Sequence, residues 1–87
     1  MKSRNGKYRL YEKYILQFLN KQTDDVAAWK IGRCTNIPKS SLYDVLGKLR
    51  SSNYIDWIGE PQDAISMILI TGKGKKHLKQ LLIMNSN

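Results

Sequence analysis

The sequence predicts a single small α+β domain that is mostly helical. Apolar residues recur at helical spacing in several segments, and two short runs rich in β-branched and aromatic residues lie between the last two of them. The composition, 41% hydrophobic and 25% charged, is that of a globular protein rather than a disordered one. With 87 residues the chain has room for one domain, residues 1–87, and a modest core, so pairing with a second copy would add stability.

Two helices are predicted in the first part of the chain. The first covers residues 7–20, where apolar side chains follow the spacing of one helical face: Leu10, Tyr11, Tyr14, Ile15, Phe18 and Leu19. After a polar loop, Trp29, Ile31 and Cys34 predict a second, short helix over residues 28–35.

A third helix is predicted over residues 38–52, after a break at Asn36 and Ile37. Pro38 cannot lie inside a helix, but its fixed φ suits the first turn of one. Four apolar residues mark the buried face of this helix: Leu42, Val45, Leu46 and Leu49.

A hairpin and a final helix complete the predicted order. The runs 54–58 and 65–70 are expected to pair as two strands around a turn at 59–63, where Pro61 fixes φ. Thr71 is predicted to be the N-cap of a last helix over residues 72–84. Two helices joined by a tight turn and followed by a hairpin form the winged helix-turn-helix plan, with a three-helix core, a two-stranded wing and a C-terminal helix.

Three segments resemble a known family. Residues 37–49 read IPKSSLYDVLGKL, residues 53–55 read NYI, and residues 69–78 read LITGKGKKHL. In that order they resemble the recognition helix, the helix-to-wing connection and the Leu-Thr-x-Lys-Gly strand end of winged-helix regulators of the MarR and PadR kind, and of small ones carried by viruses and plasmids. The resemblance covers roughly two thirds of the chain. It implies a transcriptional regulator that binds double-stranded DNA sequence-specifically, as a homodimer.

The charge distribution supports a polyanionic partner. The net charge is +8, and both ends of the chain are basic: residues 1–13 carry five Lys and Arg against one acid, and residues 71–87 carry four lysines and no acid. This balance favours nucleic acid over an anionic membrane surface. Residues 1–6 are expected to form a flexible basic arm that contacts DNA or only solubilises the chain, and residues 85–87 a C-terminal tail.

The third helix supplies most of the predicted DNA contacts. On a helical wheel, Ser40, Asp44, Gly47 and Ser51 lie opposite the buried face, flanked by Tyr43 and Lys48, and this polar face would enter the major groove. The first turn of the last helix offers lysines and bare amides to a phosphate. The predicted DNA-binding residues are Lys39, Ser40, Ser41, Tyr43, Asp44, Gly47 and Lys48, with Arg4, Arg9, Lys73, Lys75 and Lys76 outside the third helix.

Two of these residues need a specific explanation. Phosphates repel the carboxylate of Asp44, so it is expected to accept a hydrogen bond from cytosine N4 or to pair with Lys48 one turn away. Inside a helix, Gly47 lowers the stability of the fold by about 1 kcal/mol relative to alanine. Close approach of the duplex, which the missing side chain would permit, offsets this cost.

The sequence departs from the family pattern at two places. Residues 59–66, the expected wing tip, contain no Lys or Arg, whereas the family's wing usually carries an arginine that enters the minor groove. Glu60 and Asp63 make this wing acidic, so phosphate would repel it. The third helix also resembles that of Z-DNA-binding winged helices, but Tyr43 and Gly47 stand where those proteins use an Asn and a Tyr, so Z-DNA binding is not expected.

Several function classes are not expected. Cys34 is the only cysteine and His77 the only histidine, which leaves no disulfide, no Cys-based zinc cluster and no Cys/His or Ser/His/Asp set with a supporting group. Residues 72–75 lack the spacing of a phosphate-binding loop. We therefore expect a protein without catalytic activity, metal or cofactor, and nothing marks a small-molecule pocket. Without a signal peptide or an apolar run of membrane-spanning length, the expected location is the cytoplasm.

An interaction with a protein remains an alternative to DNA. Winged helices also serve as protein-binding modules, and the acidic wing and Asp44 favour that use, while the basic flanks favour DNA. The expected dimer contacts are on the first and last helices, through residues such as Tyr11, Leu82 and Met84. A two-fold dimer would place its recognition helices about 34 Å apart and would match a palindromic operator.

Overall fold

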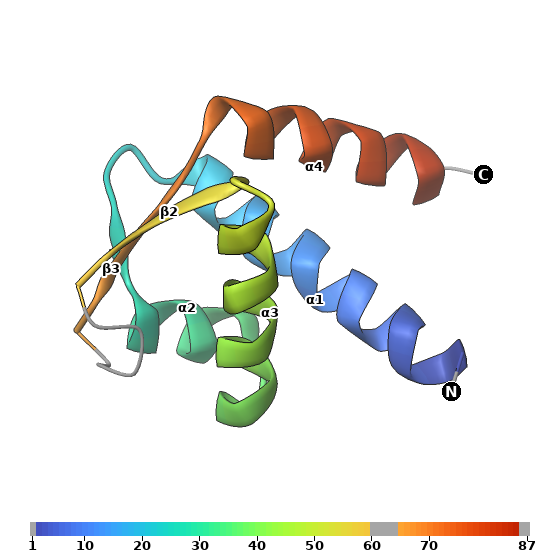
Figure 1. Cartoon of the computed structure of the whole chain (residues 1–87), viewed down its shortest axis with the longest axis horizontal. Helices are drawn as coiled ribbons and strands as arrows, with labels where there is room; N and C mark the ends of the chain where they lie inside the picture. Colours follow the sequence, from blue (N-terminus) through green and yellow to red (C-terminus); the bar gives the residue numbers. More distant parts are fainter. Residues whose placement is uncertain (1, 60–64, 86–87) are drawn as a thin grey trace.

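A computed structural model describes the backbone of residues 2–59 and 65–85 and the side chains of residues 8–59 and 65–83 (Figure 1). The described residues form four helices and a small sheet, which confirms the predicted mostly helical α+β winged-helix fold. The elements are α1 (Lys2–Lys21), β1 (Val26–Ala27), α2 (Ala28–Thr35), α3 (Lys39–Ser51), β2 (Ile55–Ile58), β3 (Met67–Ile70) and α4 (Gly72–Asn85). The turn predicted at 59–63, with Pro61, falls largely outside the described residues.

Helix α1 is longer than the apolar spacing predicts. It begins at Lys2 instead of Lys7, so the backbone of residues 2–6 is helical, and a basic arm at residues 1–6 that contacts DNA or solubilises the chain stays a prediction. Residues 2–6 are all polar or glycine, and a helical segment with no apolar face leaves no periodicity in the sequence.

The sheet has three antiparallel strands in the order β1-β3-β2, one more than the predicted hairpin. In β2 and β3, Asp56 lies opposite Leu69, and Trp57 lies opposite Ile68. Alternation along these strands sends Trp57 and Ile68 toward the helices and Asp56 and Leu69 outward. The additional strand, β1, pairs Val26 with Ile68 and is only two residues long, too short to show an alternating pattern.

The core lies where α1, α2 and α3 meet the inner face of the sheet. All four predicted α3 residues are buried, together with Ile15 and Leu19 of α1, Ile31 of α2, and Ile55 and Ile68 of the sheet. On α1 the predicted apolar face is wider than the core, because Leu10 and Tyr14 remain exposed. In α2, Trp29 and Cys34 are also exposed, and burial there falls on Ala28 and Ile31.

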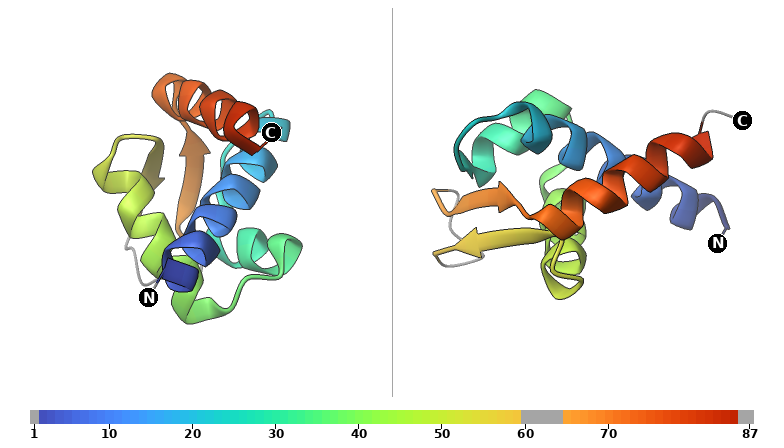
Figure 2. Two further views of the ribbon diagram at one scale, coloured as in Figure 1. Left: turned by 90° about the vertical axis from the view of Figure 1, so that its right-hand side faces the viewer. Right: turned by 90° about the horizontal axis from the view of Figure 1, so that it is seen from above.

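Helices α1 and α4 lie side by side, and the start of α1 and the end of α4 extend to the same end of the molecule, opposite the β2–β3 hairpin (Figure 2). Leu78 and Leu81 of α4 are buried, whereas Leu82 and Ile83 are exposed. No helix within the described ranges is both long and apolar enough to cross a membrane.

A hydrogen-bonded junction at Thr71 joins the start of α4 to the turn after α3. The Thr71 hydroxyl accepts a hydrogen bond from the Gly74 amide (3.0 Å) and donates one to the Asn53 carbonyl (2.7 Å). The Thr71 amide donates to the Tyr54 carbonyl at 3.0 Å. The predicted N-cap is therefore confirmed, and Thr71 also ties the two family-like segments 53–55 and 69–78 together.

Candidate nucleic-acid interface

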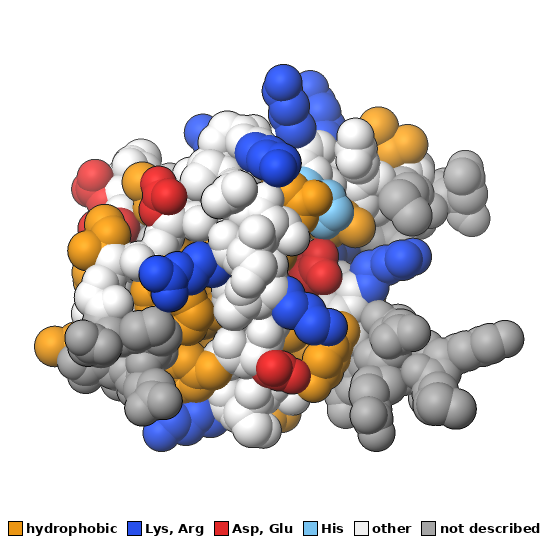
Figure 3. Space-filling model, in the orientation of Figure 1, with side chains coloured by type: hydrophobic (Ala, Val, Ile, Leu, Met, Phe, Trp, Pro, Cys, Tyr) orange, Lys and Arg blue, Asp and Glu red, His pale blue; other side chains and the backbone are white. Residues whose placement is uncertain are grey.

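The outer face of α3 carries small polar side chains. Ser40, Asp44 and Ser51 are exposed, as predicted from their position opposite the buried leucines. Lys39, Lys48 and Arg50 are exposed as well, and Ser41 is half-buried. In Figure 3 the middle of this face is mostly white, with blue Lys and Arg side chains around it and few red ones. A helix with small side chains along the middle of its outer face and cations at the edges of that face can enter a major groove and contact the phosphates beside the groove.

The edge of this face toward the sheet is fixed by an aromatic pair. The Tyr43 ring stacks on the Trp57 ring of β2, with centroids 6.2 Å apart and planes 16° apart. The indole N–H of Trp57 donates to the Ser66 hydroxyl at 2.8 Å, which holds the ring in place. Tyr43 is therefore half-buried and held against the hairpin.

The opposite edge is formed by α1. The Tyr8 hydroxyl donates a hydrogen bond to Oδ2 of Asp44 at 2.8 Å, and the Lys48 ammonium lies 4.9 Å from the centroid of the Tyr8 ring. The ion pair expected between Asp44 and Lys48 does not form; both side chains contact Tyr8 instead. Nothing in the sequence indicates this arrangement, because Tyr8 and Asp44 are 36 positions apart.

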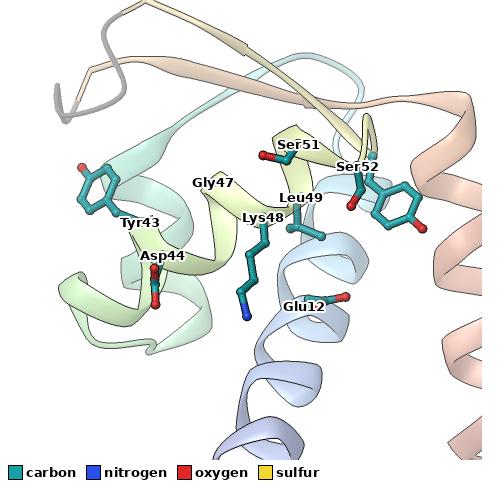
Figure 4. Close-up of a pocket in the computed structure, with 9 residues that line it drawn as sticks. Glu12, Tyr43, Asp44, Gly47, Lys48, Leu49, Ser51 and Ser52 are labelled. Carbon is teal, nitrogen blue, oxygen red and sulfur yellow. The ribbon is translucent and has the colours of Figure 1, made fainter.

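A hollow of about 630 Å³ runs along the face between these elements. Its lining includes Asp44, Gly47, Lys48 and Ser51 of α3, Glu12 of α1 and Tyr54 of the following turn (Figure 4). Lys48 reaches across it toward α1. A methyl group added to Gly47 would meet no atom within 4 Å, so no packing contact inside the chain requires glycine at this position.

The three α4 lysines do not form one cluster. Lys73 lies near the α3 hollow, because its ammonium is 5.8 Å from the centroid of the Tyr54 ring. Lys75 and Lys76 line a different hollow of about 360 Å³, with Asn20, Leu78, Lys79 and Leu82. The Gly74 amide, one of those expected to remain bare, is already bonded to Thr71.

Of the two predicted arginines, only one can be placed. Arg9 is exposed on α1, next to the tyrosine that contacts α3. The side chain of Arg4 is outside the described residues, so its contact with DNA stays a prediction. In the part of the chain whose side chains are described, no three metal-ligating residues lie together.

Comparison with known proteins finds likeness in structure but not in sequence. No family model matches the chain, and no curated protein matches it. Among solved structures, smu.1704 from Streptococcus mutans UA159 has a TM-score of 0.75 at 25% identity, over 91% of this chain and 78% of that one. The PcaV transcriptional regulator from Streptomyces coelicolor has a TM-score of 0.72 at 19% identity, over 84% of this chain and 54% of that one.

A regulator from Silicibacter pomeroyi, of the MarR family, gives a TM-score of 0.72 at 17% identity, over 88% of this chain and 60% of that one. This chain therefore spans little more than half the length of PcaV and of the Silicibacter protein. The TM-scores establish the fold, whereas sequence identities this low leave the activity open. The structural neighbours include MarR-family transcriptional regulators, and the chain has the winged-helix fold that they share.

Proposed function

We propose that this chain binds double-stranded DNA as a transcriptional regulator, with α3 in the major groove. The observation that carries the proposal is the outer face of α3: it is small and polar along its centre, and Gly47 lies there with open space above it. A glycine inside a helix costs stability, and no internal contact accounts for it. Close approach of a duplex accounts for it, because the groove floor and the helix backbone can then come together.

The charge of the chain supports the same function. A net charge of +8 attracts DNA, and the exposed cations Lys39, Lys48 and Arg50 border the face that would enter the groove. The neighbours of known description are transcriptional regulators, which agrees with this assignment. A regulator of this kind would work in the cytoplasm, where the DNA is.

We further propose a homodimer through α1 and α4. These two helices carry Leu10 and Tyr14, and Leu82 and Ile83, as exposed apolar side chains, with Ile83 64% exposed. A small domain gains stability by covering such residues against a second copy. Tyr11 is half-buried against the core, and the side chain of Met84 is outside the described residues. Sedimentation equilibrium is expected to give twice the 10.1 kDa chain mass, with Ile83→Glu shifting the protein to monomer; an unchanged monomer mass for both proteins would refute the dimer.

The experiment that tests DNA binding is a fluorescence-anisotropy titration with random-sequence duplex at several salt concentrations. Affinity is expected to fall linearly with salt on a double-logarithmic plot, because cations on the protein release counterions from the phosphates. Lys48→Gln should reduce the magnitude of that slope by about 0.9, one phosphate contact. Lys21→Gln, at the exposed end of α1 away from α3, is the matched control and should leave the slope unchanged.

A protein partner is the second candidate function, and the outer face of the wing favours it. Ile58 is 60% exposed and Ile65 71% exposed, Leu69 is exposed beside them, and Asp56 lies opposite Leu69. The described part of this surface carries the acid Asp56 and no Lys or Arg, so it fits an apolar partner with basic residues around it. The titration with duplex DNA separates the two functions. Phosphate contacts act strongly at about 50 mM salt, so absence of binding at that salt concentration would refute DNA binding and favour a protein partner at the outer face of the wing.

The PcaV transcriptional regulator has also been solved in complex with its natural ligand. This chain spans 51% of that protein.

A further inference from the structure

We propose that Tyr8 of α1 is a positioning residue of the DNA-binding face, which holds the carboxylate of Asp44 aside and the ammonium of Lys48 in place. The inference rests on the proposed DNA binding. It differs from the role predicted for Asp44, which was to read a base or to pair with Lys48.

Asp44 is the one acidic residue among the outward-facing positions of α3. It lies near the middle of the helix, so a carboxylate aimed at the groove would stand among phosphates and lower the affinity for any sequence. The structure instead turns Oδ2 toward α1, where the Tyr8 hydroxyl donates to it at 2.8 Å. This hydrogen bond to a charged acceptor stabilises the rotamer that points along the edge of the face.

The same aromatic ring contacts the cation on the next turn of α3. The Lys48 ammonium lies 4.9 Å from the Tyr8 centroid, within the range of a cation–π interaction. Held there, the ammonium lies between α3 and α1 at the border of the hollow, where a phosphate beside the groove would pass (Figure 4). One side chain of α1 therefore sets the orientation of both an anion and a cation on α3.

The consequence is a specific dependence of DNA affinity on the Tyr8 hydroxyl. Tyr8→Phe keeps the ring, and with it the contact to Lys48, but removes the donor to Asp44. The freed carboxylate can then rotate toward the phosphates, and affinity for random duplex is expected to fall about fivefold at low salt. Because the effect is Coulombic, raising the salt to several hundred millimolar should shrink it to less than twofold.

A double-mutant cycle separates this role from a merely structural one. In the Asp44→Ala background there is no carboxylate to hold, so Tyr8→Phe should change the affinity by less than 1.5-fold. Circular dichroism at the assay temperature confirms that each variant is folded.

The possible results lead to different conclusions. A fivefold loss that disappears in the Asp44→Ala background supports the inference. Equal losses in both backgrounds, or no loss in either, would overturn it while leaving DNA binding intact. If the wild-type chain itself does not bind duplex, the proposed function fails, and the inference fails with it.

Discussion

Replacing Gly74 by alanine is expected to destabilise the protein by about 3 kcal/mol, at the upper end of what overpacking costs. A Cβ at this position would meet the Tyr54 carbonyl oxygen at 2.0 Å and Ile70 Cγ1 at 2.9 Å. The nearer atom belongs to the backbone of the turn after α3, which Thr71 also holds, so it cannot move aside without breaking those hydrogen bonds. For a domain of this size the midpoint of thermal unfolding should drop by roughly 12–24 °C.

Gly72 provides the matched control for Gly74. It lies in the same first turn of α4, but a Cβ there would meet nothing within 4 Å. Gly72→Ala should therefore unfold at the wild-type temperature or slightly above it, since alanine restricts the unfolded chain more than glycine does. Differential scanning calorimetry measures the midpoint of thermal unfolding of the two variants. Equal midpoints for both would show that the hydrogen-bonded junction between α4 and the turn after α3 does not form.

Gly47→Glu is expected to have opposite effects on stability and on DNA binding. The side chain would project into open space, and glutamate is a better helix former than glycine, so the free energy of unfolding should rise by about 0.5 kcal/mol. Affinity for duplex should fall about 30-fold, or about 2 kcal/mol, because a carboxylate would stand at the centre of the face that we propose meets the DNA. Chemical denaturation and fluorescence anisotropy on the same preparation measure both quantities.

Gly47→Lys distinguishes the two reasons for such a loss. Lysine has a similar helix propensity but the opposite charge. If the duplex must approach the α3 backbone closely, the lysine variant will also bind more weakly; if charge alone matters, it will bind more tightly. A Gly47→Glu variant that binds as well as the wild type would show that α3 does not face the DNA.

The helix positions and the α3 face could be predicted from sequence because they depend on local periodicity. Leu42, Val45, Leu46 and Leu49 repeat at helical spacing, and the structure buries all four, which fixes the outward direction of Asp44 and Gly47. The Thr71 cap was predictable for a similar reason, since capping requires only a hydroxyl a few residues before an amide.

The remaining features depend on contacts between distant segments. Strand β1 exists because Val26 and Ala27 pair with β3, and two residues carry no pattern of their own. The contact of Tyr8 with Asp44 joins the first helix to the third, and only the packing of α1 across α3 brings them together. Gly72 and Gly74 look alike in the sequence, and what separates them is that the Tyr54 carbonyl and the Ile70 side chain lie against Gly74 alone.

The hydrogen-bonded junction at Thr71 also couples the orientation of α4 to that of α3. It fastens the start of α4 to the turn in which α3 ends, through two hydrogen bonds from one residue to Asn53 and Tyr54. In a dimer joined through α4, this junction would make α4 and α3 move together as one rigid body. A small rotation of one subunit against the other would therefore rotate α3 by the same angle. If the two α3 helices of such a dimer bind DNA as proposed, the distance between them would then depend on the dimer contact, and a change in that contact would alter which operator spacing fits without any change in the α3 face.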